Sequence, residues 1–193
     1  MPSVISYGAG VPDEQDLRLC GDVAGKRVVE LGGVDNAIAF AERRARALAV
    51  ADADQVSDGR ERAELAEVHV EFHAGDLGDL GFATSGSVDL VFSTGALATV
   101  DDLSRVLRQA HRVLRPEAPL VFSVPHPVAA MLGEGGVVLR RGYGGDTRTT
   151  SDYFMAVMRA GFRVDVMAEP FPVGQAGALV PAALVIRAKK LGA

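Results

Sequence analysis

The chain has 193 residues, of which 48% are hydrophobic and 23% charged, and its net charge is −5. This composition excludes a largely disordered chain, and the length predicts one domain, residues 1–193, with a sizeable core. The acidic balance argues against a nucleic-acid partner, because proteins that bind a phosphate backbone usually carry a basic face. No apolar run reaches the roughly 18 residues of a membrane span, so we expect no membrane partner either.

Cys20 is the only cysteine of the sequence. The fold therefore cannot depend on an intramolecular disulfide, and a cysteine-based zinc site is excluded. The histidines show no metal-ligand spacing, so we expect no metal. The segment from Met1 to Gly8 lacks the basic start and the apolar run of a secretory signal, and we expect a cytoplasmic protein.

The first half of the sequence predicts alternating helices and strands. Pro12 followed by acids favours the start of a helix, and glycines or polar turns separate the apolar runs that follow. Residues 1–24 are predicted to form an N-terminal cap on the domain. The predicted elements are a helix at 12–20, a strand at 26–31, a helix at 36–46, a strand at 47–51, a helix at 55–67 and a strand at 68–73.

The second half continues the alternation and ends in an antiparallel pair. The clearest helix is 101–114, because its apolar residues recur at helical spacing. We therefore predict an α/β fold with a doubly wound, mostly parallel seven-stranded sheet, Rossmann-like, with helices on both faces and an antiparallel last strand. The remaining predicted elements are strands at 87–92 and 119–124, a glycine-rich flap at 125–150, a helix at 151–160, and strands at 162–168 and 178–188.

A glycine turn follows the first predicted strand. The segment from Val28 to Gly33 reads VVELGG, so that strand ends in Glu30, a leucine and the pair Gly32-Gly33. Glycines let the backbone turn tightly and approach a ligand closely, and ligands of parallel sheets bind beyond the carboxyl ends of the strands. An ordinary strand-to-helix turn would need the same residues.

Two further acids follow the second and third predicted strands. Asp52 comes about 20 positions after Glu30, where an acid can accept hydrogen bonds from both ribose hydroxyls. It could equally be the N-cap of a helix. Asp76 lies in a Gly-Asp-Leu turn, where its carboxylate could accept from an adenine amino group while Leu77 packs on the ring; an ordinary turn residue is the alternative.

These residues resemble, in order and spacing, the class I S-adenosylmethionine-dependent methyltransferases. The likeness runs from about Tyr7 to Lys189 and includes the Arg-Val-Leu-Arg-Pro segment at 112–116 and the Ala-Gly-Phe segment at 160–162. The opening around Tyr7-Gly8 and the pair His126-Pro127 are similar to a bacterial small-molecule subgroup, of methyltransferase type 11 or 25. One departure is in the glycine motif, which is two residues shorter than the subgroup's and has fewer N–H groups for the methionine end of the cofactor.

The resemblance implies S-adenosyl-L-methionine as the cofactor, S-adenosyl-L-homocysteine as its product and a small-molecule acceptor. It implies a monomer or a homodimer. His126 is the candidate general base, because histidine titrates near neutrality; a structural loop histidine between prolines is the alternative. The cofactor-binding residues that it implies are Glu30, Gly32, Gly33, Asp52, Ala53, Asp76, Leu77, Ser93 and Thr94.

Two other functions remain open on the sequence. A non-catalytic methyltransferase-like protein would result if the short glycine loop no longer held the cofactor. A nicotinamide-dependent oxidoreductase on a related sheet is the other, but the sequence lacks a full G-x-G-x-x-G motif and predicts a closing antiparallel pair.

Overall fold

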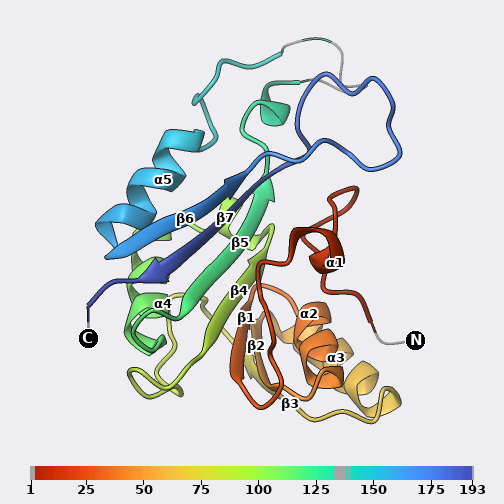
Figure 1. Ribbon diagram of the computed structural model, residues 1–193, viewed down its shortest axis with the longest axis vertical. Helices are drawn as coiled ribbons and strands as arrows, with labels where there is room; N and C mark the ends of the chain where they lie inside the picture. Colours follow the sequence, from red (N-terminus) through yellow and green to blue (C-terminus); the bar gives the residue numbers. More distant parts are fainter. Residues whose placement is uncertain (1–2, 133–137, 139, 193) are drawn as a thin grey trace.

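A computed structural model describes residues 3–132, 138 and 140–192. Its core is a sheet of seven strands in the order β3-β2-β1-β4-β5-β7-β6 (Figure 1). The first five strands run parallel, and β7 is antiparallel to both of its neighbours. The strands are β1 (Arg27–Leu31), β2 (Arg46–Ala51), β3 (Val70–Ala74), β4 (Leu90–Thr94), β5 (Pro119–Pro125), β6 (Phe162–Ala168) and β7 (Ala183–Lys190). The predicted fold class is confirmed.

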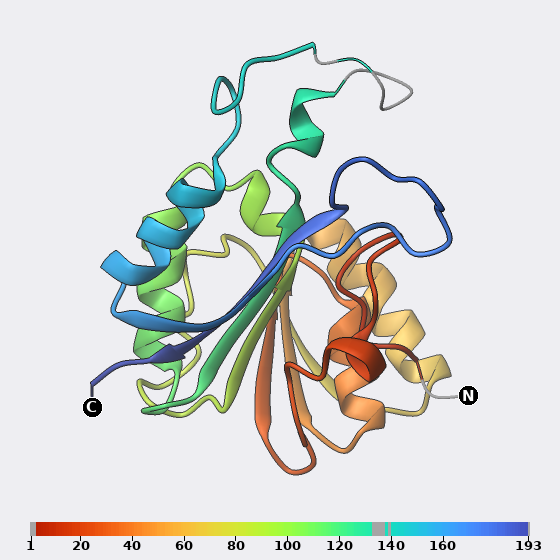
Figure 2. The ribbon, with the colours of Figure 1, turned by 45° about the horizontal axis from the view of Figure 1, so that its top comes forward.

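Helices cover both faces of the sheet (Figure 2). On one face, α2 (Asp35–Glu42) and α3 (Ala53–Leu65) pack with the N-terminal segment over a core that includes Phe40 and Phe92. On the other, α4 (Leu103–Val113) and α5 (Thr150–Arg159) enclose a second core. Burial on both faces explains why the central strands are nearly continuous hydrophobic runs.

The helix α4 illustrates how the sequence pattern produces this packing. Its apolar residues are buried along one stripe, and the Asp102 side chain caps its N-terminus by accepting a hydrogen bond of 2.8 Å from the Arg105 backbone N–H. Such a cap satisfies one of the free N–H groups of the first turn. The helix predicted at 101–114 is therefore confirmed, with slightly narrower bounds.

The predicted helix at 12–20 is wrong in extent. Only α1 (Glu14–Leu17) is helical, and it ends where Arg18 adopts a left-handed φ of 52°. The Glu14 carboxylate accepts hydrogen bonds from the backbone N–H groups of Leu19 and Cys20, at 3.0 and 2.8 Å. These bonds hold the chain in a turn where a helix would otherwise continue.

Three predicted strands start two or more residues later in the structure. The third strand starts at Val70 instead of residue 68 and the fourth at Leu90 instead of residue 87, where Val88 makes only an isolated bridge to Leu114. The last strand starts at Ala183 instead of residue 178. The five residues 178–182 belong to the loop from β6, in which Gly177 takes a left-handed φ of 84°.

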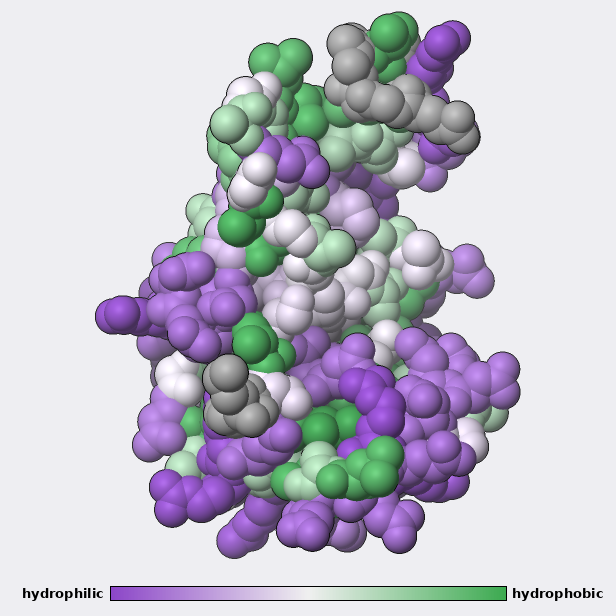
Figure 3. Space-filling view, turned by 90° about the vertical axis from the view of Figure 1, so that its right-hand side faces the viewer, coloured by the Kyte–Doolittle hydropathy of each residue, from purple (hydrophilic) through white to green (hydrophobic). Residues whose placement is uncertain are grey.

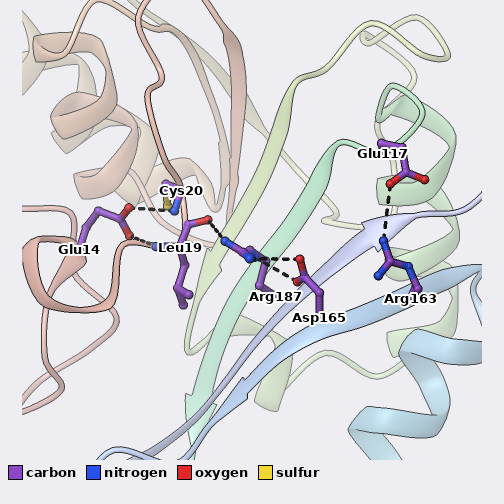
Figure 4. A network of polar contacts seen from close by, with 7 residues as sticks. All are labelled: Glu14, Leu19, Cys20, Glu117, Arg163, Asp165 and Arg187. Carbon is purple, nitrogen blue, oxygen red and sulfur yellow. Dashed lines mark hydrogen bonds and ion pairs between the residues drawn. The ribbon is translucent and has the colours of Figure 1, made fainter.

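A polar network joins the N-terminal cap to the far edge of the sheet (Figure 4). Arg187 of β7 donates to both carboxylate oxygens of Asp165 on β6, at 3.0 and 3.1 Å, and to the carbonyl oxygen of Leu19 at 3.4 Å. The guanidinium fork thus fixes a carboxylate and a loop carbonyl together. The turn held by Glu14 is thereby anchored on the antiparallel hairpin.

The predicted flap, 125–150, begins with the end of β5 and the short helix η2 (Ala129–Met131). Residues 133–137 and 139 of it lie outside the described residues, as do residues 1–2 and 193 of the predicted domain. Near its end, Arg148 donates to the carbonyl oxygens of Leu97 and Ala98, at 3.2 and 3.1 Å. These bonds attach the flap's end to the loop after β4. Across the part of the chain that is described, no helix has the length and apolarity to cross a membrane.

Candidate functional site

The loops after β1, β2, β3 and β4 meet at one edge of the sheet. Leu31 is in register with Val50 on β2 and with Ser93 on β4, and Val50 is in register with His73 on β3. The ladder continues to the edge, since the N–H of Gly32 donates to the Val50 carbonyl at 2.7 Å. This is the carboxyl edge, where open parallel sheets bind their ligands.

Glu30 is turned inward beneath this edge. Its side chain is 2% exposed and accepts hydrogen bonds from Asn36 Nδ2 at 3.0 Å and from the Ala37 backbone N–H at 2.6 Å. Burial raises the pKa of Glu30 to about 7, although these hydrogen bonds oppose the shift. Glu30 therefore secures the first turn of α2 and forms part of the floor of the site.

The two glycines of the loop have separate packing reasons. Gly32 has a φ of 82°, and a Cβ there would lie 2.0 Å from the Cβ of Ala96 on the short helix η1 (Ala96–Ala98). A Cβ on Gly33 would lie 2.8 Å from the Glu30 carboxylate. Close packing against Ala96 thus requires glycine at position 32, whereas a side chain at position 33 would have to displace the Glu30 carboxylate.

A pocket of about 410 Å³ opens beside this loop. We call it the loop pocket. It brings together four of the nine predicted cofactor-binding residues, Glu30, Gly32, Gly33 and Thr94. The residues that line it are Ser6, Gly8, Glu30, Gly32, Gly33, Val34, Asp35, Asn36, Gln55, Asp58, Arg62 and Thr94.

Asp52 and Ala53 lie at the start of α3, directly after β2, and both are exposed. Asp52 Oδ1 accepts a hydrogen bond of 2.8 Å from the Gln55 backbone N–H, so the N-cap interpretation of Asp52 is confirmed. A carboxylate has two oxygens and about four acceptor sites, so this cap leaves acceptor capacity for a ligand. Its role toward a ribose stays a prediction.

Asp76 lies beyond β3 and already has two partners. Its Oδ1 accepts from the Gly78 backbone N–H at 2.7 Å, and its Oδ2 pairs with Arg105 at 2.9 Å. It lines a pocket of about 230 Å³ whose wall includes the stacked rings of His73 and Phe82, with centroids 3.7 Å apart. Asp76 thus lies at the predicted edge, but in a different pocket from the glycine loop.

The other three predicted residues are less accessible or differently placed. Leu77 is partly buried, with its Cδ1 3.3 Å from the position of a Cβ on Gly32. Ser93 is fully buried and donates to the Leu31 carbonyl at 2.8 Å, so it lies beneath the site. Thr94 lines the loop pocket and donates to the Ser6 carbonyl at 2.9 Å.

His126 follows β5, as predicted, but both of its ring nitrogens have partners. Its Nδ1 accepts a hydrogen bond of 3.2 Å from the Val128 backbone N–H, and its Nε2 lies 2.9 Å from Glu169 Oε1. An Nδ1 that accepts requires the proton on Nε2, which then donates to Glu169. The ring is 4% exposed and joins the start of the flap to the loop after β6.

This geometry favours a positioning role for His126 over a general base. We expect His126→Ala to lower turnover by less than about tenfold, because loss of a general base typically costs roughly 10²–10⁴-fold. Steady-state kinetics would measure the change, with thermal denaturation to follow folding. A loss of turnover above a hundredfold in a folded variant would support the base instead.

A third, apolar pocket of about 280 Å³ lies against the loop pocket and shares Gly8 and Thr94 with it. Tyr7 lines it and is buried. The sequence did not predict this pocket as a whole, because small residues from four separate segments form it. The residues that line it are Tyr7, Gly8, Ala9, Val11, Thr94, Gly95, Ser123, Val124, Pro125, Ala182 and Ala183.

Solved structures share this architecture. A methyltransferase from Mesorhizobium loti matches with a TM-score of 0.72 and 22% identity, over 90% of this chain and 95% of that one. One from Listeria monocytogenes matches with a TM-score of 0.73 and 19% identity, over 91% and 96%. A geranyl diphosphate C-methyltransferase from Streptomyces coelicolor, solved with S-adenosyl-L-homocysteine, matches with a TM-score of 0.71 and 15% identity, over 92% and 76%. At these identities the likeness shows the fold.

No curated protein matches the sequence. The model of one family, described as a methyltransferase domain, matches residues 20–122, which is more than half of the chain. The matched segment contains the glycine loop, Asp52, Asp76 and β4, which are the parts that meet at the carboxyl edge. The chain therefore belongs to the methyltransferase domain family, as its motifs predicted.

Proposed function

We propose that the protein is an S-adenosylmethionine-dependent methyltransferase whose acceptor is a small apolar molecule. The observation that carries the proposal is the junction of two pockets at Gly8 and Thr94, on the carboxyl edge of the sheet. One pocket is polar and charged, and the other is lined mainly by small apolar residues. Such a pair could hold a polar methyl donor and an apolar acceptor in contact.

The residues at the edge fit the methyl donor at three points. Asp52 would accept from the ribose, Asp76 and Leu77 would contact the adenine, and the loop pocket would hold the amino-acid end. The close packing of Ala96 on Gly32 limits the approach of a ligand to that glycine. Gly95, with a φ of 75° and open space around it, gives the segment leading to Ala96 a residue that tolerates backbone adjustment.

The bound donor would supply a sulfonium methyl group, so the protein's task is to orient the acceptor and exclude water. The side chains described in the apolar pocket include no carboxylate, amine or imidazole. Its tyrosine hydroxyl donates to Glu14, and burial raises the pKa of Tyr7 far above its ordinary value. Such a pocket suits a nucleophile that needs no deprotonation by the protein.

Exposed apolar side chains lie near the N-terminal segment that lines the apolar pocket. Figure 3 shows a largely hydrophilic surface over the lower part of the molecule and more hydrophobic residues toward the top. Phe171 and Val173, in the loop between β6 and β7, are 55% and 61% exposed, and the Val173 N–H donates to the Gly10 carbonyl at 2.7 Å. An apolar acceptor would therefore meet apolar side chains next to the N-terminal segment that lines the pocket.

Asp52 provides the direct test of the cofactor site. We expect Asp52→Ala to weaken the binding of S-adenosylhomocysteine by roughly 1–3 kcal/mol, the usual cost of losing a hydrogen bond to a charged group. Calorimetric titration would measure it. Asp52→Asn keeps a good N-cap and separates ligand binding from helix capping, and Asp54→Ala changes a neighbouring exposed acid of α3 as a control. Equal affinities of wild type and both Asp52 variants would remove Asp52 from the site.

A non-catalytic methyltransferase-like protein is the second candidate. It is favoured by one observation. A Cβ built on Gly32 would lie 2.0 Å from the Cβ of Ala96 and 3.3 Å from Cδ1 of Leu77, so protein atoms already occupy the space on that side of the glycine. If η1 does not move, a ligand cannot approach that glycine from its Cβ side and can reach it only from the loop pocket. A folded protein that binds no methyl donor would support this candidate.

A further inference from the structure

Three side chains of α3 line the loop pocket. Gln55, Asp58 and Arg62 line the pocket together, and their spacing places them on one face of the helix. Arg62 is ion-paired with Asp35, the first residue of α2, and with Asp58 at 3.3 Å. The guanidinium is therefore held at the N-terminus of α2, beside the glycine loop.

The backbone of this short loop offers only a few N–H groups to an anion. Only residues 32–34 separate β1 from α2. The N–H of Gly32 donates to Val50, that of Ala37 to the Glu30 carboxylate, and that of Ile38 to the Val34 carbonyl. A helix N-terminus usually binds an anion through such groups. In the loop itself the N–H groups of Gly33 and Val34 remain for an anion, and Arg62 adds the positively charged side-chain donor among the residues that line the pocket.

The charges around Arg62 are not those of a simple anion site. Asp35, Asp58 and the buried Glu30 also line the pocket, so carboxylates outnumber the guanidinium. A free anion would meet repulsion from these acids, and a free cation would meet the guanidinium. A zwitterion satisfies both, because its carboxylate can take the guanidinium fork while its ammonium lies near the aspartates.

We propose that Arg62 binds the carboxylate of an α-amino-acid group in the loop pocket, with Asp35 and Asp58 beside its ammonium. This inference rests on the proposed function, and the amino-acid group is then the methionine-derived end of the methyl donor. Arg62 supplies a charged donor in addition to the few N–H groups of the short loop. With Arg62, the amino-acid end of the methyl donor contributes to binding affinity. With the short loop alone, most of the affinity would come from the adenosine end.

The test compares two ligands that share the thioether-substituted adenosine and differ in the amino-acid end. Wild type and Arg62→Gln are titrated calorimetrically with S-adenosylhomocysteine and with methylthioadenosine. We expect Arg62→Gln to weaken the first at least tenfold and the second by less than twofold. Arg60→Gln, at an exposed position of the same helix, should change neither, and Arg62→Lys should recover part of the loss.

The variant should fold, because the pairs of Arg62 with Asp35 and Asp58 are exposed and such pairs contribute about 0–1 kcal/mol each; thermal denaturation checks this. Equal weakening of both ligands, or unchanged affinity for S-adenosylhomocysteine, would overturn the role of Arg62. Wild type that binds both ligands equally well would overturn it too, while leaving the proposed function intact. Wild type that binds neither would overturn both.

Discussion

Gly32→Ala is expected to lower the free energy of unfolding by roughly 2–4 kcal/mol. The added Cβ would lie 2.0 Å from the Cβ of Ala96, so η1 or the loop must move. The φ of 82° adds strain, because an L-residue is disfavoured in the left-handed region. Urea denaturation measures the change.

Gly95→Ala is the matched control for this prediction. Gly95 has a similar φ of 75°, but nothing lies within 4 Å of a Cβ built there. It should therefore show the backbone strain alone, about 1–2 kcal/mol. If Gly32→Ala destabilises no more than Gly95→Ala, then the packing of η1 on the glycine loop is looser than described, and a ligand could reach Gly32 freely.

Glu30→Gln is expected to change how stability depends on pH. The pKa of Glu30 is raised from 4.5 to about 7 by burial. The folded state therefore holds this proton more tightly than the unfolded state, and its contribution to stability falls as pH rises from about 4.5 to about 7. Above pH 7 the full cost of the buried charge remains, on the order of 3 kcal/mol for such a shift.

Glutamine cannot ionise, so the variant does not lose stability in this way as the pH rises. It also loses one of the two hydrogen bonds to the start of α2, since its amide nitrogen is not an acceptor. We therefore expect Glu30→Gln to be destabilised at pH 5 and to gain on wild type by about 2–3 kcal/mol by pH 8. Guanidinium denaturation at the two pH values gives the difference, with the exposed Glu64→Gln as the control. Parallel pH profiles of wild type and Glu30→Gln would show that Glu30 titrates normally.

The sequence predicted the fold well because each element carries its own pattern. Buried strands are continuous apolar runs, and α4 has one apolar stripe with an acid at its start. The helix at 12–20 failed for a reason that propensity does not describe. The Glu14 carboxylate binds backbone N–H groups five and six residues later, and this local competition replaces further helix.

From the sequence, the candidate site could be predicted only for residues whose position at the end of a strand places them at the carboxyl edge. Asp52 and Asp76 follow the ends of β2 and β3, so topology alone brings them to the carboxyl edge. The role of Arg62 could not be predicted, because a charged residue on a polar helix face is usually solvated. Only the packing of α3 beside α2 brings it to Asp35. His126 was placed correctly in the chain, but its orientation depends on Glu169, 43 residues away.

The central claim is that this carboxyl edge binds a methyl donor. Calorimetric titration of the purified protein with S-adenosylhomocysteine, and in parallel with NADH, tests it most directly. The account predicts saturable binding of S-adenosylhomocysteine at one site per chain and no binding of NADH. Binding of NADH in its place, or a folded protein that binds neither ligand, would contradict it.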